Sequence, residues 1–266
     1  FSHVPLETHR EFILHNITPA VVDNDIYMCL VHSFRVIRRE RYLDVDASWP
    51  GENVIKCLVT FASGLFIWAA TACRFIREGK RFAPNRLEII LNSSQGSVTE
   101  PEKHLDEIYS TVLRQTVSPD YSNEERIELY TLLKKILGSI VILLSPLSIN
   151  TLGKLVCVPR KAADQTLDEL HSILDIPQNR DQPLRLHHPS FRDFLVNKKR
   201  CVDSRFCIDE IKMHEMLLIQ CVDLLSRSLK QDICDLQHTG NVTLENVDVR
   251  RVDKMMSQEV NYACVY

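Results

Sequence analysis

The chain has 266 residues and a formal net charge of −3; 45% of its residues are hydrophobic and 25% are charged. This composition is ordinary for a folded protein and excludes an intrinsically disordered chain. The near-balanced charge gives no reason to expect nucleic acid or an anionic membrane as a partner. With only 7 glycines, the chain favours helices over glycine-rich loops.

The cysteines give no sign of a disulfide framework or a zinc site. Their number, 9, is odd, they are widely spread, and no two have the C-x-x-C spacing. Residues 1–18 carry charges instead of the apolar stretch of a signal peptide. We therefore expect reduced thiols in a cytoplasmic protein. Because the chain begins with Phe and not Met, we also expect a fragment or a gene product that lacks its beginning.

Helical patterns dominate the first part of the chain. Residues 25–41 form an amphipathic pattern whose apolar stripe is Ile26, Leu30, Phe34 and Ile37. One long apolar helix is predicted over residues 52–78, with Gly79 as its C-cap. Thr99 and Ser122 each stand three residues before a glutamate, the spacing of a capping box, so a helix is expected after each.

The run from Cys57 to Cys73 needs a membrane check because it is uncharged and lies between Lys56 and Arg74. A spanning helix requires about 20 apolar residues. This run is shorter and contains Thr, Ser and Gly. We predict a buried core helix, and a transmembrane helix is the alternative.

The order of predicted elements in the second part of the chain indicates a winged-helix module. The helix that follows Ser122 should end near Ser145-Pro146, and Ser148 should cap a short helix over residues 149–156. A helix over residues 162–174 and two short strands, residues 173–176 and 184–187, come next. Helices are then predicted over residues 209–234, 243–260 and 261–266; the stripe of the first is Ile211, Leu218, Cys221, Leu225 and Leu229.

The predicted fold is thus almost entirely α. It comprises a helical segment over residues 1–120, a winged-helix domain with a small β-wing over residues 121–200, and the start of a helical array over residues 201–266.

The junction after the second strand is the most suggestive segment for chemistry. Leu184 and Leu186 alternate with polar residues, and Pro189 suits the first position of a helix. His188 is then the cap residue. Because a helix N-terminus offers N–H groups and partial positive charge, His188 is expected to face an anion such as a phosphate.

The other parts of a phosphate site are missing. A phosphate loop has the pattern G-x-x-x-x-G-K-[ST]. The pairs Gly79-Lys80 and Gly153-Lys154 each fail that pattern at two positions. No dinucleotide, hydrolase-elbow, zinc-protease or EF-hand motif is present either. The chain is therefore predicted not to be an enzyme on its own.

Metal and DNA binding are weaker interpretations. His187 and His188 are adjacent, so on a strand they point to opposite faces and cannot easily chelate one ion. The basic runs at residues 38–41 and 198–200 close predicted helices, where they complement the dipole. The expected recognition helix, residues 162–174, carries three acids and no base, which is unfavourable near phosphates.

Several segments resemble fungal NACHT-type signalling NTPases of the STAND class. Residues 64–76 (GLFIWAATACRFI) are similar to the helix after the nucleotide core. Residues 132–195, with LLSPLS at 143–148 and HPSFRDFL at 188–195, resemble the winged-helix domain. Residues 229–236 (LKQDICDL) and 262–266 (YACVY) resemble the helical domain that follows.

The resemblance implies a role for His188. In this family the matching histidine contacts the β-phosphate of bound ADP and holds the inactive state. An arginine of a Thr/Ser-Arg-Pro stretch is also expected, but here Ser2-His3-Val4-Pro5 stands in its place. The phosphate loop and the acidic magnesium-binding strand are absent from this sequence, so ADP or ATP belongs to a complete member.

By this resemblance the chain is the regulatory part of a nucleotide-gated, NLR-like switch in self/non-self recognition and programmed cell death. Its partners would be an NTPase core or homologous protomers, with a homo-oligomer possible and no nucleic acid or membrane. Two alternatives stay open: a helical scaffold or adaptor without a nucleotide role, and a winged-helix DNA-binding protein.

Overall fold

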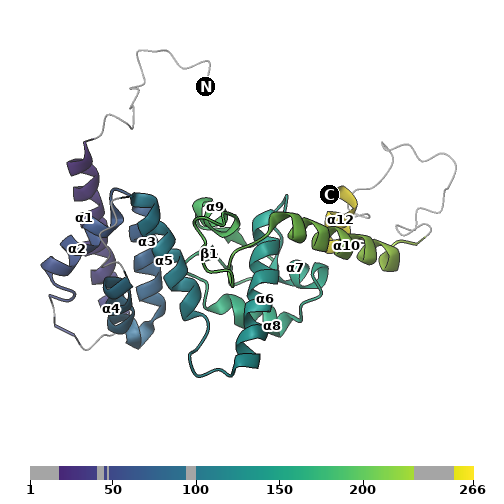
Figure 1. The fold of residues 1–266 in the computed structure, drawn as a ribbon, viewed down its shortest axis with the longest axis horizontal. Helices are drawn as coiled ribbons and strands as arrows, with labels where there is room; N and C mark the ends of the chain where they lie inside the picture. Colours follow the sequence, from purple (N-terminus) through teal and green to yellow (C-terminus); the bar gives the residue numbers. More distant parts are fainter. Residues whose placement is uncertain (1–17, 41–44, 47, 94–99, 231–254) are drawn as a thin grey trace, which may run out of the picture. The chain divides into compact units, whose positions relative to one another are not determined.

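The computed structural model describes residues 18–40, 45–46, 48–93, 100–230 and 255–266. Over these residues the protein is mostly helical, with eleven α-helices and one two-stranded antiparallel sheet (Figure 1). This confirms the predicted fold class. The chain divides into two compact units, Phe1–Ile108 and Tyr109–Tyr266, whose boundary falls within helix α5 (Pro101–Gln115). The finer division at residues 120 and 200 stays a prediction.

The first unit is built from consecutive helices. They are α1 (Pro19–Glu40), α2 (Glu52–Ala62), α3 (Phe66–Glu78), the 3₁₀ turn η3 (Lys80–Phe82), α4 (Ala83–Ser93) and the first part of α5. In α1 the buried side chains are Ile26, Leu30, Phe34 and Ile37, the stripe that the sequence predicts. The spacing of apolar residues predicts the buried side chains of α1 correctly because this helix buries a single face.

The single helix predicted over residues 52–78 is wrong. Ser63 adopts a left-handed conformation with φ 47° and Gly64 follows with φ 77°, so the chain turns between α2 and α3. A glycine reaches positive φ without the steric cost of a Cβ. Gly79 does cap α3, although in a right-handed conformation with φ −63°, and not in the left-handed geometry of a typical glycine cap.

No helix within the described residues is long and apolar enough to cross a membrane. The uncharged run at residues 57–73 is shared between α2 and α3, and much of it is buried in the first unit. Trp68 of α3 is fully buried, and its indole Nε1 donates a hydrogen bond of 3.1 Å to the carbonyl of His104 in α5. The core-helix interpretation of this run is therefore preferred, with two helices in place of one.

The second unit begins with the end of α5 and contains the remaining elements. They are α6 (Asn123–Ile142), α7 (Ile149–Leu155), α8 (Arg160–Asp168), β1 (Leu174–Asp175), β2 (Arg185–Leu186), α9 (Ser190–Val196), α10 (Glu210–Ser228) and α12 (Gln258–Val265). The capping box of Ser122 and Glu125 is present at α6, and Ser148 caps α7 through its hydroxyl. Both caps were predicted; Thr99 and residues 243–254 lie outside the described residues.

The strands pair as the sequence predicts. β1 and β2 are antiparallel, with Leu174 opposite Leu186. A bridge joins Ser148 to Pro183, and the Leu184 N–H donates to the Leu147 carbonyl at 2.9 Å. The segment between α6 and α7 therefore lies beside the segment that leads into β2. The order of three helices, two strands and a helix agrees with the predicted order of elements, and the assignment as a winged-helix module stays a prediction.

Helix α10 differs from its prediction in length and in face. It ends at Ser228, and its buried residues are Leu217 and Cys221. Gly138 of α6 allows close packing, because a Cβ there would lie 2.7 Å from the methyl carbon of Met213. Ile211, Leu218 and Leu229 of the predicted stripe are exposed. Cys221 of the predicted stripe is buried, so the stripe matches the packed side of α10 only in part.

Candidate functional site

His188 lies between β2 and α9 and is exposed. The helix begins at Ser190, one residue later than predicted, with Pro189 at its cap in a right-handed helical conformation. The His188 ring nevertheless performs a capping function, because its Nδ1 accepts the Ser190 N–H at 3.2 Å. The Phe191 N–H donates to the His188 carbonyl at 3.3 Å.

These bonds change what the junction offers to an anion. The sequence suggested free backbone N–H groups at the start of α9. Pro189 has no N–H, and the N–H groups of Ser190 and Phe191 both donate to His188 itself. The N–H groups of Ser190 and Phe191 are therefore already engaged, and the imidazole ring is a group that could meet a ligand.

A short hydrogen-bond chain fixes the His188 ring. The Ser190 hydroxyl oxygen lies 2.7 Å from His188 Nδ1 and 2.8 Å from the hydroxyl of Tyr109 in α5. Tyr109 is 1% exposed and its ring contacts Phe191 and Phe194 of α9, with centroids 5.0 and 5.6 Å apart. The exposed ring is thus connected to a buried aromatic cluster of the second unit.

The bonding pattern assigns the tautomer of His188. A backbone N–H can only donate, so Nδ1 of the neutral ring must be the acceptor. The ring proton then resides on Nε2. Among the residues of the second unit that the structure describes, Nε2 has no hydrogen-bond partner, so an exposed N–H donor with a fixed direction remains, which is the chemistry that suits a phosphate oxygen.

The arginine of α9 is already engaged. Arg192 of α9 donates from Nε to the Val141 carbonyl at 2.9 Å and from Nη2 to Glu210 at 2.7 Å. Its guanidinium therefore connects α9 to α6 and α10. Because the arginine is committed in this way, it is not free to share an anion with the His188 ring.

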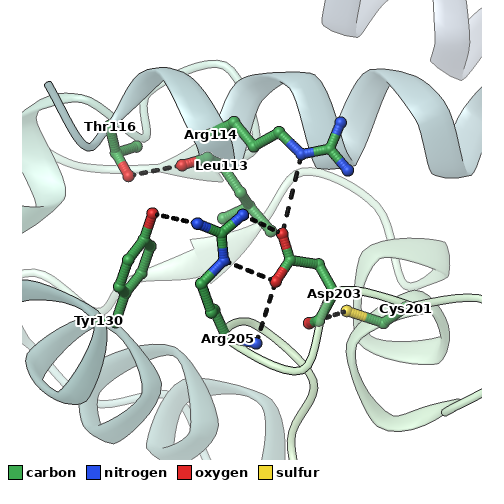
Figure 2. Close-up of polar contacts among 7 residues, drawn as sticks. All are labelled: Leu113, Arg114, Thr116, Tyr130, Cys201, Asp203 and Arg205. Carbon is green, nitrogen blue, oxygen red and sulfur yellow. Dashed lines mark hydrogen bonds and ion pairs between the residues drawn. The ribbon is translucent and has the colours of Figure 1, made fainter. Parts of the chain in front are cut away.

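A second polar cluster, around Asp203, was not predicted (Figure 2). Asp203 accepts from Arg205 Nε at 2.8 Å and Nη2 at 2.6 Å, and Arg114 of α5 lies 3.8 Å from its Oδ2. Arg205 Nη1 also donates to the Tyr130 hydroxyl of α6 at 2.9 Å, and its guanidinium stacks over that ring.

The electrostatics of this cluster indicate that it connects elements of the fold. Hydrogen bonds from Arg205 hold the pKa of the Asp203 carboxyl below its ordinary value, and the same pair raises the pKa of Arg205. The side chain of Asp203 is 13% exposed. Because both carboxylate oxygens and the guanidinium have protein partners, the Asp203 cluster connects α5, α6 and the loop before α10 and offers little to a ligand.

The predicted recognition helix is only partly as expected. Helix α8 starts at Arg160 and so contains two bases, Arg160 and Lys161, in its first turn. Arg180, from the loop between the strands, pairs with Asp164 at 3.3 Å and Asp168 at 3.2 Å. Two of the three acids are therefore partly neutralised within the module, which weakens the electrostatic argument against DNA without creating a basic surface.

Metal chemistry finds no support in the described part of the chain. Within it, no group of three or more His, Cys, Asp or Glu residues is placed to hold an ion, and the eight cysteines found there are free. His187 and His188 have different hydrogen-bond partners: His187 Nε2 lies 3.1 Å from the His171 carbonyl, and His188 Nδ1 lies 2.7 Å from the Ser190 hydroxyl.

Comparison with known proteins adds no further constraint. No protein-family model matches the chain, and no curated protein or solved structure is similar to it at a significant level.

Proposed function

We propose that this chain is the regulatory part of a nucleotide-gated, NACHT-type signalling switch, and that His188 contacts a phosphate of bound ADP. The observation that supports the proposal is the fixed and exposed His188 ring. Nδ1 is held by Ser190, so Nε2–H remains for an anion. The segments that resemble this family include the α9 sequence in which the ring is anchored.

In this proposal the chain performs no catalysis. The nucleotide is bound by an NTPase core, on a longer chain or on a homologous protomer, in the cytoplasm. His188 contributes one charge-assisted hydrogen bond, and the Ser190–Tyr109 connection transmits its occupancy to the buried cluster of α9. One such bond contributes about 1.5–3 kcal/mol, which is too little for measurable affinity without the core. Calorimetry of this chain with ADP should therefore show no micromolar binding.

The decisive experiment needs the coding sequence upstream of Phe1. A reading frame there with G-x-x-x-x-G-K-[ST] would support the proposal. In the longer protein, His188→Ala should weaken ADP binding about tenfold or more, as expected for a hydrogen bond to a charged group. His214→Ala is the matched control, because His214 is also exposed but lies on α10. Equal affinities for the two variants would contradict the role of His188.

A helical adaptor without a nucleotide role is the second candidate. It is favoured by the exposed apolar side chains of α10, which a protein partner could cover. An upstream frame without a phosphate loop, together with unchanged behaviour of His188→Ala in partner binding, would favour the adaptor. A DNA-binding role would require a steep salt dependence in an electrophoretic shift experiment.

A further inference from the structure

A hollow of about 470 Å³ lies between α6, the loop that follows α9 and the start of α10, all within the second unit. Three of the side chains that line it are lysines, namely Lys134, Lys198 and Lys212. The hollow is open to solvent, because Val202 is 82% exposed and Lys198 and Lys212 are exposed as well. We call this site the lysine hollow.

Between its lysines, the lysine hollow has a largely apolar lining. Cys201, Val202, Cys207, Ile208 and Met213 contribute to it. Cys201 and Ile208 are buried, and Met213 is half-buried. The exposed Val202 therefore adjoins apolar surface that the side chain of a ligand can cover. The volume of the hollow lies within the range of ligand sites, about 300–1,000 Å³.

The charge of the lining is positive. Among the lining residues, Asp209 is the one carboxylate that faces the three lysines. Its Oδ2 lies 3.9 Å from Lys198 Nζ, and its Oδ1 accepts the backbone N–H of Lys212 at 3.4 Å. The ammonium groups of Lys134 and Lys212 form no ion pair with a residue that the structure describes. Two cations are therefore left for a ligand.

The acidic residues on either side of this loop do not neutralise those lysines. Asp203 is paired with Arg205 at 2.6 Å, and Glu210 is paired with Arg192 at 2.7 Å. The 19-residue helix α10 also begins at the hollow, and a helix N-terminus has partial positive charge. The lysine hollow therefore combines uncompensated positive charge with apolar surface.

The loop that forms much of the hollow is held at both ends by backbone hydrogen bonds. The Cys201 N–H donates to the Asn197 carbonyl at 2.8 Å, and the Ile208 N–H donates to the Leu195 carbonyl at 2.8 Å. A site that is already formed requires less ordering of the protein when a ligand binds. The lysine hollow can therefore receive a ligand without rearrangement of its loop.

We propose that the lysine hollow binds a short acidic segment of a partner protein. Carboxylates of the segment meet Lys134 and Lys212, and one apolar side chain covers Val202. Charge complementarity supports this occupant. An extended segment can reach lysines on three separate elements, whereas a small free anion would leave the apolar lining uncovered. This binding requires no nucleotide, so it is independent of the function proposed for His188.

The affinity should be modest and dependent on salt. Exposed ion pairs are individually weak and are screened by ions. We therefore expect a dissociation constant on the order of 10–100 µM at low salt. It should weaken about fivefold or more when the salt concentration rises from about 0.05 M to about 0.5 M.

Selection from a display library of random short peptides tests the proposal on the whole chain. Peptides are selected on the wild type and counter-selected on the double variant Lys134→Glu/Lys212→Glu. We expect the enriched peptides to combine several Asp or Glu residues with a Leu or Phe. An absence of enrichment, or enrichment of basic or uncharged peptides, would overturn the proposal.

Fluorescence anisotropy with an enriched peptide then tests the lysines. Lys134→Glu should weaken binding about tenfold or more, because it places a like charge beside the carboxylates of the peptide. Lys135→Glu is the matched control: Lys135 is the next residue of α6, is also half-buried and does not line the hollow. Both variants change the net charge equally. Equal losses of affinity would therefore reduce the effect to net charge and overturn the proposal.

Val202→Ser tests the apolar contact and should weaken binding of the same peptide about threefold to tenfold. Val222→Ser is its control, because Val222 is 54% exposed on α10 and does not line the hollow. Circular dichroism should show that all these variants remain folded, because each side chain reaches solvent. No effect of Val202→Ser would overturn the apolar contact.

Vesicles of phosphatidylserine and phosphatidylcholine distinguish a membrane from a protein partner. We expect Lys134→Glu and Lys135→Glu to have the same effect on any sedimentation of the chain with these vesicles. Vesicle binding that Lys134→Glu alone abolishes, together with no enriched peptide, would assign the lysine hollow to an anionic lipid surface and overturn the proposal.

Discussion

The second unit contains two polar networks that differ in what they leave open. At Asp203, the carboxylate accepts hydrogen bonds from Arg205 and lies near Arg114. The Arg205 guanidinium also donates to the Tyr130 hydroxyl. At His188, one ring nitrogen is held by Ser190, while the other has no partner among the described residues of that unit. Both networks include an aromatic hydroxyl, that of the buried Tyr109 at His188 and that of the half-buried Tyr130 at Asp203. A closed network, in which the polar groups have protein partners, stabilises the fold. A half-open network, in which one polar group has no such partner, can also bind a ligand.

The largest expected effect comes from the aromatic support of His188. Phe191 is 1% exposed and packs on Tyr109, so Phe191→Ala should lower the free energy of unfolding by about 3–5 kcal/mol. Phe82→Ala is the control, because Phe82 is 55% exposed and should cost far less. Chemical denaturation measures both variants. Similar losses would mean that the cluster under α9 is not the core that we describe.

The second-largest loss of stability is expected for the closed network around Asp203. Asp203→Asn removes the charge that two arginines face, and we expect a loss of about 1–3 kcal/mol at neutral pH. Asp175→Asn, at an exposed position of β1, should change stability little. If the two substitutions cost the same, the Asp203 cluster does not join the elements as proposed.

The same substitution has a defined pH dependence. The pKa of Asp203 is lower in the folded state, so its stabilising contribution is complete above the pKa of an unfolded aspartate, about 3.9. The contribution is lost as the pH falls through the lower folded value. The difference in stability between wild type and Asp203→Asn should therefore be constant from pH 7 to pH 5 and shrink below about pH 4. A difference that grows on acidification would contradict this assignment.

A smaller effect is expected at the half-open network. Ser190→Ala removes the hydroxyl that joins His188 to Tyr109 but keeps the backbone N–H bond to Nδ1. We expect a loss of about 1 kcal/mol, measured by thermal unfolding. Ser204→Ala, in the exposed loop before α10, serves as the control. A loss as large as that of Phe191→Ala would indicate that Ser190 has a core role that the bonds do not explain.

The parts of this fold that could be predicted are those decided locally. The caps at Ser122 and Ser148 depend on side chains within three residues of the helix start, and the stripe of α1 depends on one buried face. The break between α2 and α3 was missed because an apolar run with one glycine also fits a continuous helix. The periodicity of apolar residues does not show that Ser63 adopts a left-handed conformation.

The parts that could not be predicted depend on distant partners. Periodicity identified α10 as a helix but could not decide which of its two apolar sides is covered, because that depends on α6, α7 and α12. The Asp203 cluster joins residues about ninety positions apart in the chain, Arg114 and Asp203. Only the Asp-x-Arg spacing of Asp203 and Arg205 is visible in the sequence. At His188 the sequence predicts a residue that faces an anion, which stays a prediction; the hydrogen bonds of its ring to Ser190 could not be read from the sequence.

The tautomer of His188 tests the central claim most directly. Long-range ¹H–¹⁵N correlation spectra recorded at about pH 8.5, where an ordinary imidazole is neutral, distinguish a protonated Nε2 from a protonated Nδ1. We expect a single tautomer with the proton on Nε2 for His188, while exposed His214 shows the averaged signals of a free ring. A proton on Nδ1 of His188, or the same averaging as His214, would contradict it.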